Sequence, residues 1–128
     1  MTTRRKIARL VLPWPKLSEL SANSRLHWRA KHRKTKAQKN MAAWLAIEVG
    51  LQRVKIEDEA QIFVTYTACP PSRVSRFDDD NLGTALKGAR DAIAEVLGVD
   101  DSRFQVQPIE RGERSKDGGV IVEIEVAA

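Results

Sequence analysis

The chain has 128 residues, of which 42% are apolar and 30% are charged, and its formal net charge is +5. This length suits one domain with a hydrophobic core, expected here over residues 1–128, and no stretch approaches the roughly 20 apolar residues that cross a membrane. The single cysteine, Cys69, excludes an internal disulfide and a zinc site built on cysteines. Arg9 and Pro13 interrupt the apolar run near the start, so we expect no secretion signal and a location in the cytoplasm.

Six regular elements are predicted along the chain. Strands are expected where β-branched and apolar residues concentrate or alternate, and helices where apolar residues recur every three or four positions. The predicted strands lie at 6–12, 60–68, 104–111 and 120–126, and the predicted helices lie at 31–51 and 81–97. The order β-α-β-α-β-β indicates an α/β fold of the α+β type, with a small mixed sheet packed against two main helices.

The first half of the chain has a loop and a helix after its first strand. Pro13 ends that strand, because proline neither donates to a β-ladder nor fits a helix interior, and residues 16–29 are expected to form an ordered loop. The apolar residues that recur at helical spacing in the helix at 31–51 are Met41, Trp44, Leu45 and Val49. We expect this face, with Trp44 in the core, to pack inward.

The second half has the most regular helical pattern. Its apolar positions, at helical spacing, are Leu82, Leu86, Ala89, Ile93, Val96 and Leu97. Gly98 is a suitable stop for one continuous helix over 81–97. A hairpin turn at 116–119 is expected to join the last two strands.

Positive charge is concentrated between residues 20 and 47, where the sequence has no Asp or Glu. Such a run fits a polyanion such as DNA, or it is simply a solvated helix face. The candidate phosphate contacts are Arg25, Arg29, Arg33, Lys34, Arg73 and Arg76. His27 and His32 are either bases or contacts to phosphate and solvent, and Trp14 and Trp28 either pack or stack on bases.

Acidic residues gather at 78–80 and at 100–101. In an extended segment Asp78 and Asp80 would share one face, and paired carboxylates suit magnesium, which activates water for phosphodiester hydrolysis. A third carboxylate is available at Asp100 or Asp101. The intervening helix spans roughly 25 Å, so bringing these acids together needs contact between protomers or a return of the chain.

Other interpretations of these residues stay open. Aspartates at a helix start also cap free amides, although three in succession exceed what a cap requires. A calcium loop of the EF-hand type is excluded, because Ala89 stands where its glutamate is needed. Lys87 either meets a phosphate or pairs with Asp91 four residues later.

Several of these segments together resemble the RusA-type Holliday junction resolvases, over nearly the whole chain. The segments that carry the resemblance are Leu12-Pro13-Trp14-Pro15, Asn23-Ser24-Arg25-Leu26-His27, Arg76-Phe77-Asp78-Asp79-Asp80-Asn81-Leu82, Leu86-Lys87, Arg90-Asp91-Ala92-Ile93 and Gly98-Val99-Asp100-Asp101. The chain differs from the best-known member by a few extra residues before Leu86, and its basic arm at 29–39 is more basic.

The resemblance implies a homodimeric α/β nuclease that binds four-way junctions and uses magnesium, or manganese, to make paired nicks in DNA recombination and repair. By position, the implied metal ligands are Asp78, Asp80 and Asp101, with Asp100 as second choice for the third, and Lys87 is the implied essential lysine. In that family the carboxylates of both subunits cluster near the dimer axis. The alternative is a non-catalytic DNA-binding or phage scaffolding protein whose acids only cap a helix.

Overall fold

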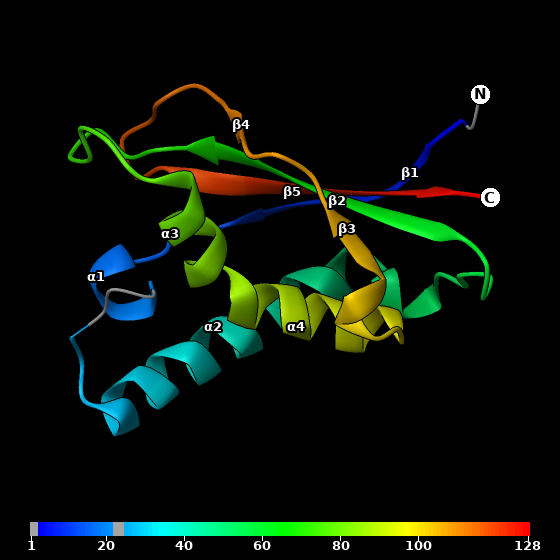
Figure 1. The fold of residues 1–128 in the computed structure, drawn as a ribbon, viewed down its shortest axis with the longest axis horizontal. Coiled ribbons are helices and arrows are strands. Elements are labelled where there is room, and N and C mark those ends of the chain that lie inside the picture. Colours follow the sequence, from blue (N-terminus) through cyan, green and yellow to red (C-terminus); the bar gives the residue numbers. More distant parts are fainter. Residues whose placement is uncertain (1–2, 22–24) are drawn as a thin grey trace.

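A five-stranded mixed sheet covered by helices on one face forms the molecule (Figure 1). The computed structural model describes residues 3–21 and 25–128, so Asn23 and Ser24 of the resemblance lie outside the described residues. The elements are β1 (Arg5–Leu12), α1 (Leu17–Leu20), α2 (Trp28–Glu48), η1 (Leu51–Arg53), β2 (Gln61–Cys69), α3 (Asp79–Ala85), α4 (Lys87–Leu97), η2 (Asp101–Arg103), β3 (Phe104–Val106), β4 (Glu110–Arg111) and β5 (Gly119–Ala127). The α+β class and the mixed sheet over two main helices are confirmed.

The sheet has the order β1-β5-β2-β3, and β4 also pairs with β2. β5 runs antiparallel to both β1 and β2, whereas β3 and β4 run parallel to β2. Val120, Val122 and Ile124 of β5 are fully buried and face the helices. Alternate positions such as Glu123 and Thr65, paired across β5 and β2, stay partly exposed on the other face, as the twofold period of a strand requires. The core therefore lies between the sheet and the pair α2 and α4.

α2 packs through its small residues. Ala42 and Ala46 are completely buried, whereas Met41 is 49% exposed and Trp44 is 68% exposed. Small side chains let two helices approach closely, and α2 uses them against α4, where a side chain at Gly88 would meet atoms of α2. Met41 and Trp44 consequently turn to solvent, whereas Leu45 packs partly against the core. The expectation of a core Trp44 was wrong.

The helix predicted at 81–97 is broken at Leu86 into α3 and α4. The carboxamide of Gln38, from α2, enters the break: its Nε2 donates to the carbonyl of Ala85 at 2.8 Å, and its Oε1 accepts from the N–H of Ala89 at 3.2 Å. In a continuous α-helix these two backbone groups would bond to each other. A side chain inserted into this ladder bends the helix, which explains the break.

Three further predictions were corrected. The strand expected at 104–111 is divided into β3 and β4, with Pro108, which cannot donate a ladder hydrogen bond, between them. The hairpin at 116–119 was wrong, because β4 pairs with β2 and β5 crosses over to lie between β1 and β2. The loop expected at 16–29 contains the short helix α1. In the part of the chain that the structure describes, no helix is long and apolar enough to cross a membrane.

The close approach of α2 and α4 predicts different effects of adding a methyl group at two glycines. A Cβ at Gly88 would lie 2.9 Å from Gln38 Oε1 and 3.1 Å from Thr35 Cγ2, whereas a Cβ at Gly83 has nothing within 4 Å. Relative to Gly83→Ala, Gly88→Ala should lower the free energy of unfolding by about 1 to 3 kcal/mol, because the helices must move apart. Urea denaturation of both variants measures this difference, and equal stability would contradict the packing.

Removal of the Gln38 carboxamide should destabilise the bend. We expect Gln38→Met to lower the free energy of unfolding by about 1 to 3 kcal/mol, because a buried carbonyl and a buried N–H lose their partner. The matched control is Gln52→Met, an exposed glutamine whose replacement should change stability by less than about 0.5 kcal/mol. Equal denaturation midpoints for the two variants would count against a role for the inserted side chain.

Candidate functional site

Asp78 caps the start of α3. Its backbone is extended, and its Oδ1 accepts hydrogen bonds from the N–H groups of Asp80 at 2.7 Å and Asn81 at 3.2 Å. The extended segment assumed from the sequence therefore ends at Asp78, and Asp80 lies in the first helical turn. The capping role that the sequence left open is present at this aspartate.

Asp79 points to a different partner. Its carboxylate accepts from Arg111 at 2.5 Å, and the Arg111 guanidinium lies 4.0 Å from the centre of the Phe77 ring. Phe77 in turn meets the ring of Trp14 edge-on at 5.2 Å. This series of contacts holds the segment before α3 against β4, and it gives Trp14 a packing role.

Asp80 and Lys87 line one hollow, of about 640 Å³, on the surface beside α3. The other lining residues are Asp79, Gly83, Thr84, Arg90, Val106, Gln107, Pro108 and Ile109. Asp80 is exposed, and its backbone carbonyl accepts from the Thr84 hydroxyl at 3.0 Å. Two carboxylates, of Asp79 and Asp80, and two cations, Lys87 and Arg90, thus border the same space.

An adjoining hollow of about 420 Å³ contains the second acidic pair and is also bordered by Lys87. Asp100 caps η2 by accepting from the Ser102 N–H at 3.1 Å, and this bond lowers the pKa of Asp100. The pKa of Asp101 is raised, mainly by a side-chain hydrogen bond with Asp91 and secondly by one with Asp100. Of the two acids, Asp101 is therefore the one that faces Asp91.

Arg90 and Asp91 belong to this site, although the sequence interpretation assigned them no part in it. Arg90 Nε lies 4.0 Å from Asp101 Oδ2, and this buried nitrogen has no hydrogen-bond partner in the part of the chain that the structure describes. Arg90 and Asp91 follow Lys87 by three and four residues, so all three share one side of α4. Their spacing from Lys87 is the one sign in the sequence that Arg90 and Asp91 could share its site.

The candidate acids do not converge on one point within a protomer. Among residues 3–21 and 25–128, no three or more His, Cys, Asp or Glu side chains are arranged to hold a metal ion. Asp80 and Asp101 line separate hollows that share Lys87. The structure therefore brings each of these acids near the lysine, whereas Asp78 stays at the helix cap.

The candidate phosphate contacts lie on two segments. Arg25, Arg29 and Arg33 are exposed at and near the start of α2, and exposed Lys34 pairs with Glu19 at 3.6 Å. The other two, Arg73 and Arg76, are exposed between β2 and α3. In Figure 1 both segments lie on the left, near α1 and α3.

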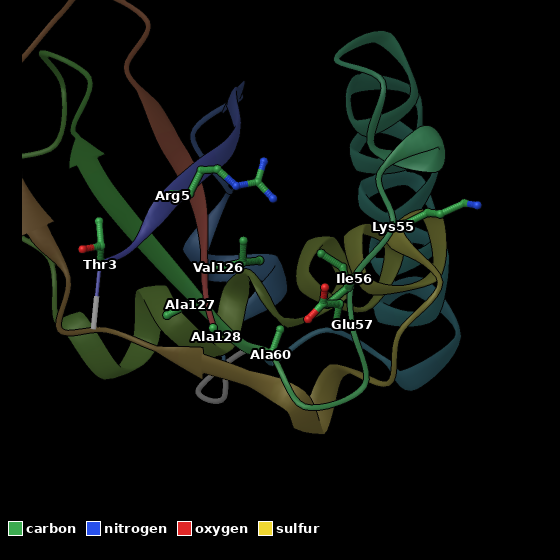
Figure 2. Close-up of a pocket in the computed structure, with 9 residues that line it drawn as sticks. All are labelled: Thr3, Arg5, Lys55, Ile56, Glu57, Ala60, Val126, Ala127 and Ala128. Atoms are coloured by element: carbon green, nitrogen blue, oxygen red, sulfur yellow. The ribbon is translucent and has the colours of Figure 1, made fainter. Parts of the chain in front are cut away.

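A separate hollow of about 250 Å³ lies where β1 begins and β5 ends (Figure 2). Arg5, Lys55 and Glu57 are its charged lining residues, and Figure 2 shows Lys55 pointing away from the space. None of the candidate site residues lines this hollow.

Comparison with known proteins gives one relative of this chain. An "Uncharacterized protein" of Xylella fastidiosa (strain Temecula1 / ATCC 700964) is 34% identical over 115 residues, which cover 90% of this chain and 74% of the relative. The chain belongs to the same family as that protein. No family model matches the sequence. The relative's name states no activity.

Buried Tyr66, which interacts with the charges of Arg90 and Asp91, is expected to titrate unusually. Burial raises the pKa of Tyr66 to about 12, although Arg90 opposes the shift, and Asp91 adds to it. Because an unfolded tyrosine ionises near pH 10.0, the stability contributed by neutral Tyr66 should be present below pH 10 and should be lost as the pH rises towards 12.

Tyr66 is the only tyrosine, so the absorbance of ionised phenol reports it alone. We expect ionisation in the folded protein only near pH 12, or together with alkaline unfolding. Reversible ionisation near pH 10 with an unchanged circular dichroism spectrum would contradict this environment.

Proposed function

We propose that this protein is a magnesium-dependent, structure-selective endodeoxyribonuclease of the RusA type. It would resolve Holliday junctions and related branched DNA in recombination and repair, in the cytoplasm. The observation that carries the proposal is the position of Lys87 between two hollows, one bordered by Asp80 and the other by Asp101. Carboxylates beside a lysine and an arginine suit the joint binding of a cation and a phosphodiester.

The donor atoms available fit magnesium or manganese. Both are hard ions that prefer oxygen, and magnesium often uses one or two carboxylates together with waters and substrate phosphates. Asp80 and Asp101 would supply such carboxylates, and Asp78 is the third proposed ligand, with its carboxylate oriented by the N–H groups that it caps. When bound, the ion polarises a phosphoryl oxygen and lowers the pKa of the attacking water.

The protein side chains would position the phosphate. Lys87 stands at the first residue of α4 and is exposed, so its ammonium is free to meet a phosphate oxygen. Arg90 is held more firmly, because its Nε is buried beside Asp101. Together they would orient the phosphodiester for in-line attack and offset the charge that develops on it.

Exposed arginines of α2 and of the segment before α3 support a long DNA contact. Arg25, Arg29, Arg33, Arg73 and Arg76 are all exposed, and Lys34 pairs only across the surface with Glu19. Binding through such contacts should weaken steeply with added salt, since each neutralised phosphate releases counterions.

We further propose that the active form is a homodimer. A single protomer has no group of three acids suited to a metal in its described part, and a second copy would bring further carboxylates and allow paired nicks. Light scattering in solution would give the mass of two chains, and a monomer at working concentration would refute this part.

A non-catalytic DNA-binding or phage scaffolding protein remains the second candidate. It is favoured by the structural roles of Asp78, which caps α3, and Asp79, which pairs with Arg111. In that case the acids would organise the helix start and DNA would bind without being cut in any metal.

Cleavage of a labelled four-way junction, with a matched linear duplex, tests the proposal. With magnesium, we expect paired nicks in the junction alone, no cleavage in EDTA, and a loss of roughly 100-fold or more in Asp80→Asn, because one charge at the site is removed. Flap and fork substrates in the same assay report which branched structure is preferred.

The matched control is Asp58→Asn, the same change at an exposed aspartate in the loop before β2, and it should cleave as the natural protein does. Salt-sensitive binding of the junction without cleavage in magnesium or manganese would contradict the nuclease function. It would favour the non-catalytic DNA-binding or phage scaffolding protein. Full cleavage activity in Asp80→Asn would show that Asp80 has no role in cleavage.

A further inference from the structure

Trp28 is the first residue of α2, and 68% of its surface is exposed. Its ring has a cation on one side in sequence and an aromatic ring on the other: the Arg29 guanidinium lies 5.2 Å from the ring centre, and the ring of His27 lies 5.7 Å away at 31°. Trp14 is different, because it packs edge-on against Phe77. An exposed indole next to a cation offers an aromatic surface on which a base can stack, beside a charge that attracts phosphate.

The helical spacing of α2 connects Trp28 to the candidate site. Positions 28, 32, 35 and 39 follow one another at i, i+4, i+7 and i+11 and therefore lie along one face. His32, Thr35 and Lys39 of this face line a hollow of about 500 Å³ between α2 and α4. Lys39 also lines the hollow that contains Asp101. Trp28 thus stands at the outer end of a row that leads, over roughly 16 Å of helix, to the acids.

Charge and shape along this row fit a single DNA strand. Nucleic acid strands are bound by cations that track the phosphates and by aromatic rings on which bases stack. Lys36 and Lys39 border the hollow on the side of α2, opposite Asp91 and Glu95 of α4. Arg29 and Arg33 are exposed on the same half of α2. A paired base in a duplex presents no open face to Trp28, whereas an unpaired base does.

We propose that Trp28 is a stacking site for an unpaired base of DNA and that the row from Trp28 to Lys39 guides the unpaired strand towards Asp101. This inference rests on the proposed function, since it names the part of a branched substrate that the protein recognises. The test of the stacking site measures binding without cleavage. The stacking site and the nuclease function can therefore be disproved independently of each other.

The test is binding of a labelled oligodeoxythymidylate of roughly 12 nucleotides, in EDTA, compared with an oligomer of equal length in which every base is missing. The abasic oligomer keeps the phosphates and loses the stacking. The natural protein should bind the oligomer with bases about tenfold more tightly than the abasic one, and Trp28→Ala should bind both with equal affinity. Trp28→Phe should keep the preference, because phenylalanine also stacks.

Trp44→Ala is the matched control. Trp44 is also 68% exposed on α2, but it lies 16 residues further on, about 160° around the helix from Trp28. It should keep the natural preference for bases. A preference in Trp28→Ala equal to that of the natural protein, or no preference in the natural protein, would overturn the stacking site. If the protein preferred the oligomer with bases but did not cleave the junction, the nuclease function would be contradicted and the stacking site would stand.

Discussion

The site depends on one carboxamide. Gln38 of α2 occupies the place of a helical hydrogen bond between Ala85 and Ala89, and it thereby bends the helical segment that carries Asp80 before the bend and Lys87 after it. In a straight helix these residues, seven apart, would lie on one face and about 10 Å apart along a single axis. The bend instead sets an angle between the two helices from which they border one hollow. The orientation of a lysine relative to a carboxylate is therefore set by a third helix, which contributes neither group.

Packing by small side chains makes this contact possible. Ala42, Ala46 and Gly88 bring α2 and α4 close enough for Gln38 to reach the backbone of the other helix. The same arrangement leaves Trp28 and Trp44 on the surface, since the fully buried residues of α2 are the alanines Ala42 and Ala46. The use of small residues where α2 meets α4 thus accounts both for the bend beneath the candidate site and for the exposed indole of Trp28 at the start of α2.

The sequence predicted the fold class and the main helices, because the hydrophobic period acts locally. It left the capping role of Asp78 open beside the expectation of an extended segment. It did not predict the break at Leu86, whose cause is a side chain 47 residues or more away in sequence. The prediction of a hairpin at 116–119 was wrong for a related reason. The partner of a strand depends on contacts across the whole sheet, which local sequence does not reveal. Among the site residues, Arg90 and Asp91 were missed because their significance comes from Asp101, which reaches them only through the fold.

The place of β5 affects how the chain reaches this fold. β5 follows all the other regular elements in sequence, yet it lies between β1 and β2, and β1 joins the sheet only through it. As the polypeptide is synthesised, β1 has no strand to pair with until residues 119–127 are available. Contacts between such distant segments slow folding, because a long loop must close before they form. β1 therefore stays without this partner until the segment that contains β5 has been made.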